Sequence, residues 1–230
     1  MWRVLLTILI FGCSCQNYHD FIGAEYLGVK YVRDPLGEGV APDTDPLIRF
    51  DAFDCTTFVE TVLAGGDEQK LNQIRYKNGQ IEFTNRNHFI ETDWIKNNSK
   101  LVKNVSAQYA PTAVRTVTID KKNWFKINHN IDTKFEKQTV NLEYIPYKYA
   151  RNITVTEPKI VLFVNAPGRA PERIGTDLAV RHMGFLLPDG RLRHASWHKK
   201  SVVDVDFHKY VNQMMENQNK LGIMLMEIQK

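Results

Sequence analysis

Residues 49–66 read RFDAFDCTTFVETVLAGG, and this stretch decides how the rest of the chain is interpreted. From Asp54 onward the apolar residues recur at helical spacing, and Gly65-Gly66 marks the end of the predicted helix. Asp54 is a suitable N-cap, which places Cys55 in the first helical turn. The unpaired main-chain N–H groups and the helix dipole at that end favour an anion. The pattern therefore fits either an activated cysteine nucleophile or a buried structural thiol.

The composition is that of a globular protein. Hydrophobic residues make up 43% of the 230 residues and charged residues 24%, which argues against disorder. The net charge is only +4, and lysine and arginine are dispersed among acidic residues without a long basic run. We therefore expect no nucleic-acid partner. No repeat or linker divides the sequence, so we expect one α+β domain over residues 16–230.

Residues 1–15 predict an export segment. One arginine precedes an apolar run from Val4 to Gly12, which is too short to span a bilayer as a mature helix. Its length is typical of the hydrophobic region of a secretory signal. The run ends in Ile10-Phe11-Gly12-Cys13, which resembles a bacterial lipobox with Cys13 as the lipidated residue. We expect an exported, periplasmic lipoprotein with a lipid anchor at Cys13.

The three cysteines form no CxxC pair, which argues against a zinc cluster or a disulfide framework. We expect no metal and no cofactor. An exposed thiol without a function is an oxidation liability in an oxidising compartment. This consideration favours a chemical role for Cys55.

Several other segments carry clear local signals. Asp67 is a plausible N-cap for a second helix, and residues 159–166 (KIVLFVNA) have the continuous apolar character of a buried strand. Residues 101–157 alternate β-branched and polar residues, as in VRTVTI and RNITVTE. The remaining expected elements are a loop at 34–46, a short strand at 81–83, a short helix at 91–98, a strand at 201–207, a helix at 206–217 and a closing strand at 222–228.

A β-hairpin brings two histidines together. Residues 178–187 and 191–196 read as strands joined by a turn at Pro188-Asp189-Gly190. His182 and His194 then lie on paired strands, where their rings can meet across the ladder. Gly184 leaves space on the same face for a closely approaching chain. Together with Cys55, the histidines supply the nucleophile, base and orienting group that a covalent catalytic site needs.

These motifs resemble those of the NlpC-type, papain-like superfamily of cell-wall hydrolases. The matching segments are DCTTFVE, RHMGF, LRHAS and, upstream, LGVKY. The resemblance implies a papain-like α+β fold in which a cysteine-bearing helix packs on a mainly antiparallel sheet or half-barrel. It also implies that Cys55 is the nucleophile, His182 the general base and His194 the orienting residue, with Tyr31 lining the site.

Further segments resemble one branch of this superfamily, described as N-acetylmuramoyl-L-alanine amidase-like. They are IRYKNG, NRNHF, TDWI and GTD, within a resemblance that covers about residues 22–228. The resemblance implies hydrolysis of the amide between N-acetylmuramic acid and L-alanine in peptidoglycan or its fragments. It suggests Arg86, His88, Asp93 and Trp94 as substrate contacts, Arg86 for a carboxylate and Trp94 as a platform for the sugar. Phe89 stands where the branch pattern leads us to expect tyrosine.

Three alternatives remain open at the level of sequence. The same chemistry could cut between D-glutamate and the diamino acid of the stem peptide. A non-catalytic lipoprotein could bind wall fragments through a degenerate site. A metal hydrolase could use His182 and His194, although the strand spacing differs from the helical HExxH pattern and no third ligand is evident. In each case we expect a monomer.

Overall fold

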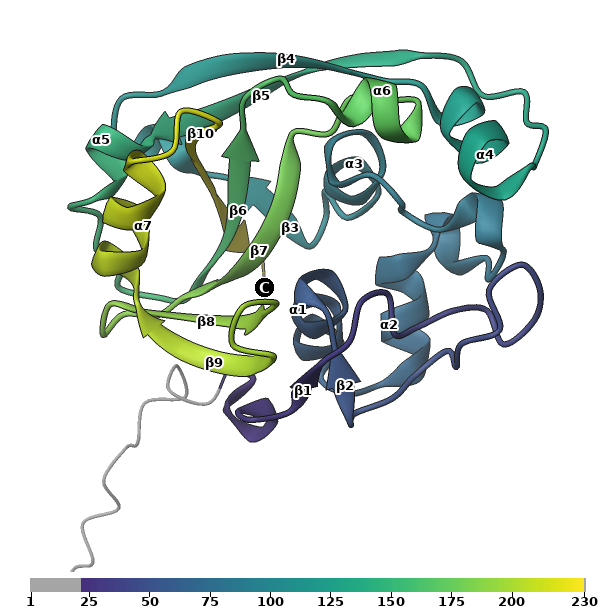
Figure 1. Ribbon diagram of the computed structural model, residues 1–230. Coiled ribbons are helices and arrows are strands. Elements are labelled where there is room, and N and C mark those ends of the chain that lie inside the picture. The colour runs from purple at the N-terminus through teal and green to yellow at the C-terminus, as the bar shows by residue number, and fades with distance from the viewer. Residues whose placement is uncertain (1–21, 230) are drawn as a thin grey trace, which may run out of the picture.

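The computed structural model describes residues 22–229 and shows a mixed α+β fold (Figure 1). One mixed sheet has the strand order β2-β1-β9-β8-β7-β6-β10-β5-β4, and β3 pairs with β10 off this path. The β1–β2 pair is parallel and the other pairs are antiparallel. The strands are β1 (Lys30–Tyr31), β2 (Ala52–Phe53), β3 (Val102–Asn104), β4 (Ala113–Ile119), β5 (Gln138–Pro146), β6 (Lys159–Asn165), β7 (Val180–Leu186), β8 (Arg191–Ser196), β9 (Ser201–Asp206) and β10 (Lys220–Ile228).

Helices cover both faces of the strongly curved sheet, with α1 and α2 on one side and α5 and α7 on the other (Figure 1). The α-helices are α1 (Cys55–Ala64), α2 (Glu68–Arg75), α3 (Ile95–Asn97), α4 (Lys121–His129), α5 (Tyr147–Ala150), α6 (Ala170–Ile174) and α7 (Phe207–Met215). A π-helical turn, Ile90–Trp94, runs directly into α3, where the sequence predicts a short helix.

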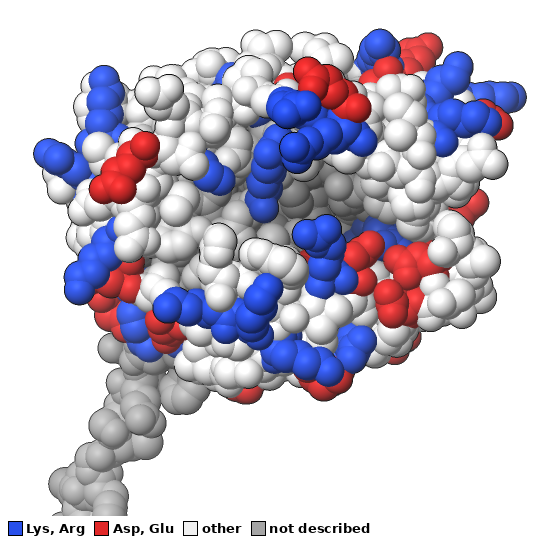
Figure 2. Space-filling model, viewed as in Figure 1, with Lys and Arg blue, Asp and Glu red and all other residues white. Residues whose placement is uncertain are grey.

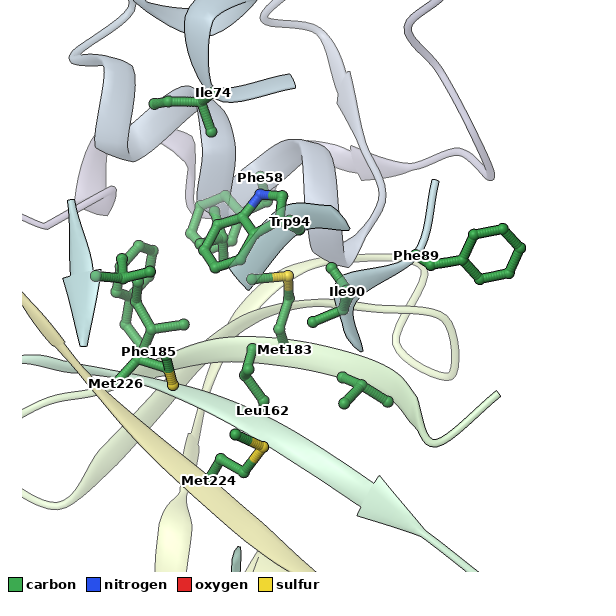
Figure 3. Packing of buried hydrophobic residues seen from close by; sticks show 14 of the residues in the cluster. Phe58, Ile74, Phe89, Ile90, Trp94, Leu162, Met183, Phe185, Met224 and Met226 are labelled. Carbon is green, nitrogen blue, oxygen red and sulfur yellow. The ribbon is translucent and has the colours of Figure 1, made fainter. Parts of the chain in front are cut away.

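Strand β6 is the centre of the core because both of its faces are buried. Leu162 and Val164 pack in one apolar cluster, and Val161 and Phe163 pack in another beneath α5 and α7. Figure 3 shows Leu162 and its sheet neighbours pointing toward Trp94 and the helical layer. A strand covered on both sides reads as a continuous apolar run, which is why its position is evident in the sequence.

Helix α1 begins at Cys55 because Asp54 caps it. The Asp54 carboxylate accepts a hydrogen bond from the Thr57 main-chain N–H at 2.8 Å, and the Thr57 hydroxyl accepts one from the Asp54 N–H at 2.9 Å. This reciprocal capping box satisfies the end of the helix. Gly65 ends the helix in the left-handed conformation, with φ of 63°. The helix packs against β7 and β8, so Cys55 faces the histidine hairpin.

The predicted hairpin forms, and Gly184 is the position of closest approach. Phe185 pairs with Arg193 and Leu186 with Leu192. A Cβ atom at Gly184 would lie 2.7 Å from the Arg193 carbonyl oxygen and 2.8 Å from the His194 Cβ. The missing side chain is therefore what lets β8 bring His194 next to β7.

Three parts of the middle region differ from expectation. Residues 81–83 form no strand: Phe83 begins a 3-10 turn, and its ring packs against Phe125 and His88 instead of joining the sheet. The RNITVTE segment is irregular, although Ile153 and Val155 are buried against the second cluster. Helix α4 forms within the region where alternating β-branched and polar residues predict strands. The sequence features that mark this helix are the capping residues at its ends, Asp120 and Asn130.

The predicted export segment and Cys13 lie outside the described residues. Within residues 22–229, no helix has the length and apolar character needed to cross a membrane.

We predict that Gly184→Ala lowers the free energy of unfolding by about 1–3 kcal/mol, because the added methyl overpacks the β7–β8 contact. Denaturant unfolding monitored by tryptophan fluorescence measures the change. Gly168→Ala is the matched control, since a Cβ atom added at Gly168 would have its nearest neighbour 3.7 Å away, and it should change stability by less than about 1 kcal/mol. Equal stability of the two variants contradicts the prediction.

Candidate active site

A cavity of about 730 Å³ brings four of the predicted residues together: Tyr31, Cys55, His182 and His194. Its walls come from β1, the start of α1, β7–β9, α7 and the start of β10. Figure 2 shows a hollow at the centre of this face with lysine and arginine side chains gathered around it. Segments distant in the sequence thus converge on the cysteine.

The two histidines form a direct hydrogen bond. The Nε2 atom of His182 lies 2.6 Å from Nδ1 of His194, and the rings are steeply inclined at 75°. Since Nε2 of His182 is engaged, Nδ1 is the ring nitrogen left for a proton from another group. Phe163 stacks on the His182 ring at 5.3 Å and fixes its plane.

Tyr210, on α7, packs against the rings of both histidines. Its ring meets His194 edge-on at 5.5 Å and also contacts Phe163. Burial lowers the pKa of His182 to about 3, with further contributions from His194 and Lys220, and burial lowers the pKa of His194 to about 4. Both rings are therefore neutral near pH 7, the form in which an imidazole can act as a base.

The Cys55 thiol is half-buried and neutral. Burial and the adjacent Asp54 carboxylate raise the pKa of Cys55 to about 12. The helix N-terminus, which favours an anion, is therefore not sufficient to ionise this thiol. The main-chain N–H of Met183 donates toward the sulfur and favours the thiolate, but burial outweighs it. A thiolate at Cys55 thus requires proton transfer to a base during the reaction.

An exposed tryptophan that the sequence reasoning missed forms one wall of the cavity. Trp197 is 50% exposed and lies at the β8–β9 turn, with its ring 5.6 Å from that of Tyr31. The Lys200 ammonium lies 3.2 Å from the Trp197 ring centroid. The only sequence signal was its position shortly after His194. His198, the next residue, also lines this cavity.

Arg86 is not a free cation. Its guanidinium forms two hydrogen bonds with Glu38, at 2.8 and 2.7 Å, and a third with Asp43 at 2.7 Å. These carboxylates come from the 34–46 loop, and all three side chains are largely buried. The predicted contact of Arg86 with a substrate carboxylate is therefore corrected to an intramolecular ion-pair cluster that fixes this loop.

Trp94 and Asp93 are also interior residues. Trp94 has no exposed surface, and its indole N–H donates to the buried Glu60 at 3.0 Å. Asp93 pairs with Lys121 at 3.0 Å. Neither side chain offers a face to a sugar, which corrects their predicted role as substrate contacts.

His88 lies in a second cavity of about 250 Å³ beside the first turn of α1. Its Nε2 lies 2.7 Å from the Phe83 carbonyl oxygen, and burial lowers its pKa well below the ordinary value. It is thus separate from the cavity that holds the Cys55 thiol. Phe89, where the branch pattern led us to expect tyrosine, is buried in the core.

Within residues 22–229, no group of three or more histidine, cysteine, aspartate or glutamate side chains is arranged to hold a metal ion.

We predict that His182 and His194 both remain neutral between pH 5 and 8, because their pKa values lie near 3 and 4. The unfolded chain takes up these protons near pH 6.5, so the free energy of unfolding should fall as the pH drops from 6.5 toward 4. Side-chain ¹⁵N shifts from NMR measure the protonation directly. Titration of either ring near pH 6.5 contradicts the prediction.

We predict that Arg86→Gln lowers the free energy of unfolding by about 3–5 kcal/mol, because it leaves buried carboxylates without a partner. Arg169→Gln is the matched control: it removes an exposed ion pair with Glu172 and should cost less than about 1 kcal/mol. Denaturant unfolding compares the two. Equal effects would show that the Arg86 cluster does not stabilise the fold.

Comparisons with known proteins agree with this architecture. A crystal structure of a protein from Legionella pneumophila superposes with a TM-score of 0.83 at 24% sequence identity, covering 92% of this chain and 88% of that chain. An N-acetylmuramoyl-L-alanine amidase from Bacteroides uniformis superposes with a TM-score of 0.69 at 25% identity, covering 91% and 97%. No curated protein matches the sequence.

The family model for AmiA-like, N-acetylmuramoyl-L-alanine amidase-like proteins matches residues 21–218, a span that includes Cys55 and the histidine hairpin. The chain therefore belongs to the N-acetylmuramoyl-L-alanine amidase-like family.

Proposed function

We propose that this protein is a cysteine-dependent cell-wall amidase that hydrolyses the amide between N-acetylmuramic acid and L-alanine in peptidoglycan or its fragments. The observation that carries the proposal is the 2.6 Å His182–His194 hydrogen bond in the cavity that also holds Cys55. Family membership and the Bacteroides neighbour named as such an amidase support the choice of bond. The cysteine at a helix start facing a histidine hairpin further supports placing the fold in the papain-like, NlpC-type superfamily.

The proposed mechanism begins with a neutral thiol and a neutral imidazole. For Nδ1 of His182 to accept the thiol proton, Nε2 must carry hydrogen and donate to Nδ1 of His194. His194 then holds the His182 ring in one tautomer and stabilises the imidazolium that forms. The sulfur attacks the lactyl carbonyl carbon, and the oxyanion is held by the Cys55 main-chain N–H in the first turn of α1.

The second half of the reaction returns the protons. His182, now protonated, transfers its proton to the leaving nitrogen of L-alanine as the carbon–nitrogen bond breaks. Water then attacks the thioester with His182 again as base, releasing the muramic acid carboxylate and restoring the thiol of Cys55. Tyr31 borders the nucleophile, and its pKa, raised to about 12 chiefly by burial, keeps its hydroxyl protonated.

We predict that Cys55→Ala lowers kcat/KM on muropeptides by at least about 10³-fold without changing the thermal midpoint by more than a few degrees, because only the nucleophile is lost. His182→Ala should lower it by about 10²–10⁴-fold. His208→Gln is the matched histidine control, since His208 lies outside the cavity and its ring bonds the Arg151 carbonyl oxygen. Undiminished turnover by Cys55→Ala would refute the nucleophile assignment and favour a non-catalytic binding protein.

The scissile bond is tested separately by mass spectrometry of digested muropeptides. Release of the intact stem peptide from the sugar supports the amidase. A product that retains L-Ala-D-Glu on the sugar instead identifies an endopeptidase acting before the diamino acid.

For a cell-wall amidase, export through residues 1–15 would deliver the enzyme to its substrate.

A further inference from the structure

Two β-bulges flank the same end of β6, next to the catalytic histidine. On β7, Phe163 pairs with His182 and Val164 with Val180, so Arg181 is an additional residue in the strand. On β10, Val164 pairs with Gly222 and Asn165 with Lys220, which leaves an additional residue there as well. Bulges of this kind redirect side chains and are common beside active sites.

The bulge on β7 changes which side chains reach the cavity. Adjacent residues of a regular strand point to opposite faces, yet Arg181 and His182 both line the cavity. Lys220, at the start of β10, lines it too. The irregular strand ends therefore place two cations beside the base.

Buried polar groups hold this arrangement. The Glu91 carboxylate accepts hydrogen bonds from the Ala179 and Val180 main-chain N–H groups, at 2.6 and 2.7 Å. The Asn165 side chain donates to the Ala179 carbonyl oxygen at 3.0 Å. Glu91 and Asn165 are both almost fully buried. These hydrogen bonds fix the main chain at Ala179 and Val180, the two residues that precede Arg181.

Arg181 and Lys220 lack an anionic partner within residues 22–229, where no ion pair involves either side chain. Their charges repel each other. The pKa of Lys220 is lowered chiefly by burial, with a further contribution from the charge of Arg181. Two like charges without a counter-charge in a cleft repel each other and favour the binding of an anion.

The opposite wall of the cavity differs in chemistry. Trp197 is 50% exposed at the β8–β9 turn. The Lys200 ammonium covers one face of its ring, and an aromatic ring can pack against the apolar side of a sugar. In the sheet, β8 and β9 lie on one side of β7, and β6 and β10 lie on the other. The cleft thus has Trp197 at one end, with Lys199 and Lys200 beside it, and Arg181 and Lys220 at the other end, with His182 between them.

We propose that Arg181 and Lys220 form a carboxylate-binding subsite for the stem peptide, with the muramoyl group directed toward Trp197. This inference rests on the proposed function and deepens it by assigning the leaving-group side of the cleft. The residue after L-alanine is D-glutamate, which keeps one free carboxylate in the stem peptide, and this group is the anion nearest to the scissile amide. An arginine and a lysine together supply a planar donor pair and a point charge for such a group.

The test measures binding of two ligands to the full-length Cys55→Ala protein, which removes turnover. The ligands are muramoyl-L-Ala-D-Glu and the same compound with both glutamate carboxyl groups amidated. We expect the acid to bind at least about ten-fold more tightly, equivalent to about 1.4 kcal/mol. Adding Arg181→Gln and Lys220→Gln should reduce this preference to below about two-fold, whereas Lys122→Gln, at an exposed position of α4, should preserve it. Thermal unfolding verifies that each variant is folded.

Three results would overturn the subsite: equal affinity for acid and diamide, a preference that survives both substitutions, or binding of neither ligand. Hydrolysis by the wild-type protein is scored independently. A carboxylate preference without hydrolysis would refute the proposed function but support the subsite. Hydrolysis without a carboxylate preference would support the proposed function but refute the subsite.

Discussion

The complete burial of β6 is the constraint on which the site depends. Because both faces of this strand pack against apolar clusters, β6 cannot itself present polar side chains to the candidate site. Its neighbours supply them where the regular pairing ends: His182 opposes Phe163, and the bulges begin at the next residue of β6. The core therefore fixes where the chemistry can occur, and Phe163 contributes directly by stacking on the His182 ring.

The electrostatics of the site link catalysis to ligand binding. The thiol and both imidazoles are neutral, chiefly because burial disfavours every charged form. Lys220 also disfavours the imidazolium of His182. An anion held by Arg181 and Lys220 would offset that repulsion and make His182 a stronger base. Under the proposed function, the substrate would thus help to generate the thiolate–imidazolium pair that attacks it.

Local signals in the sequence were sufficient for the elements that carry the candidate catalytic residues. Asp54 and Gly65 mark the ends of α1, and Gly184 marks the close approach of the hairpin. The substrate contacts could not be predicted in this way. Arg86 meets Glu38, 48 residues away, and Trp94 reaches a carboxylate on α1. Such partners arise only from tertiary packing, so a motif could not show that they satisfy these side chains internally.

The bulges were equally invisible in the sequence, because alternating patterns assume regular strands, yet they bear on which bond is cut. In an amidase the leaving amine belongs to L-alanine, and under the proposed function the free carboxylate of D-glutamate follows it toward Arg181 and Lys220. In the endopeptidase alternative, the leaving residue is a diamino acid, which would bring an additional ammonium group as well as a carboxylate toward Arg181 and Lys220. Like charges at short range in a partly desolvated cleft are unfavourable. Under the proposed function, cleavage of the muramoyl–alanine bond thus places a carboxylate, and not an ammonium group, nearest to these two cations.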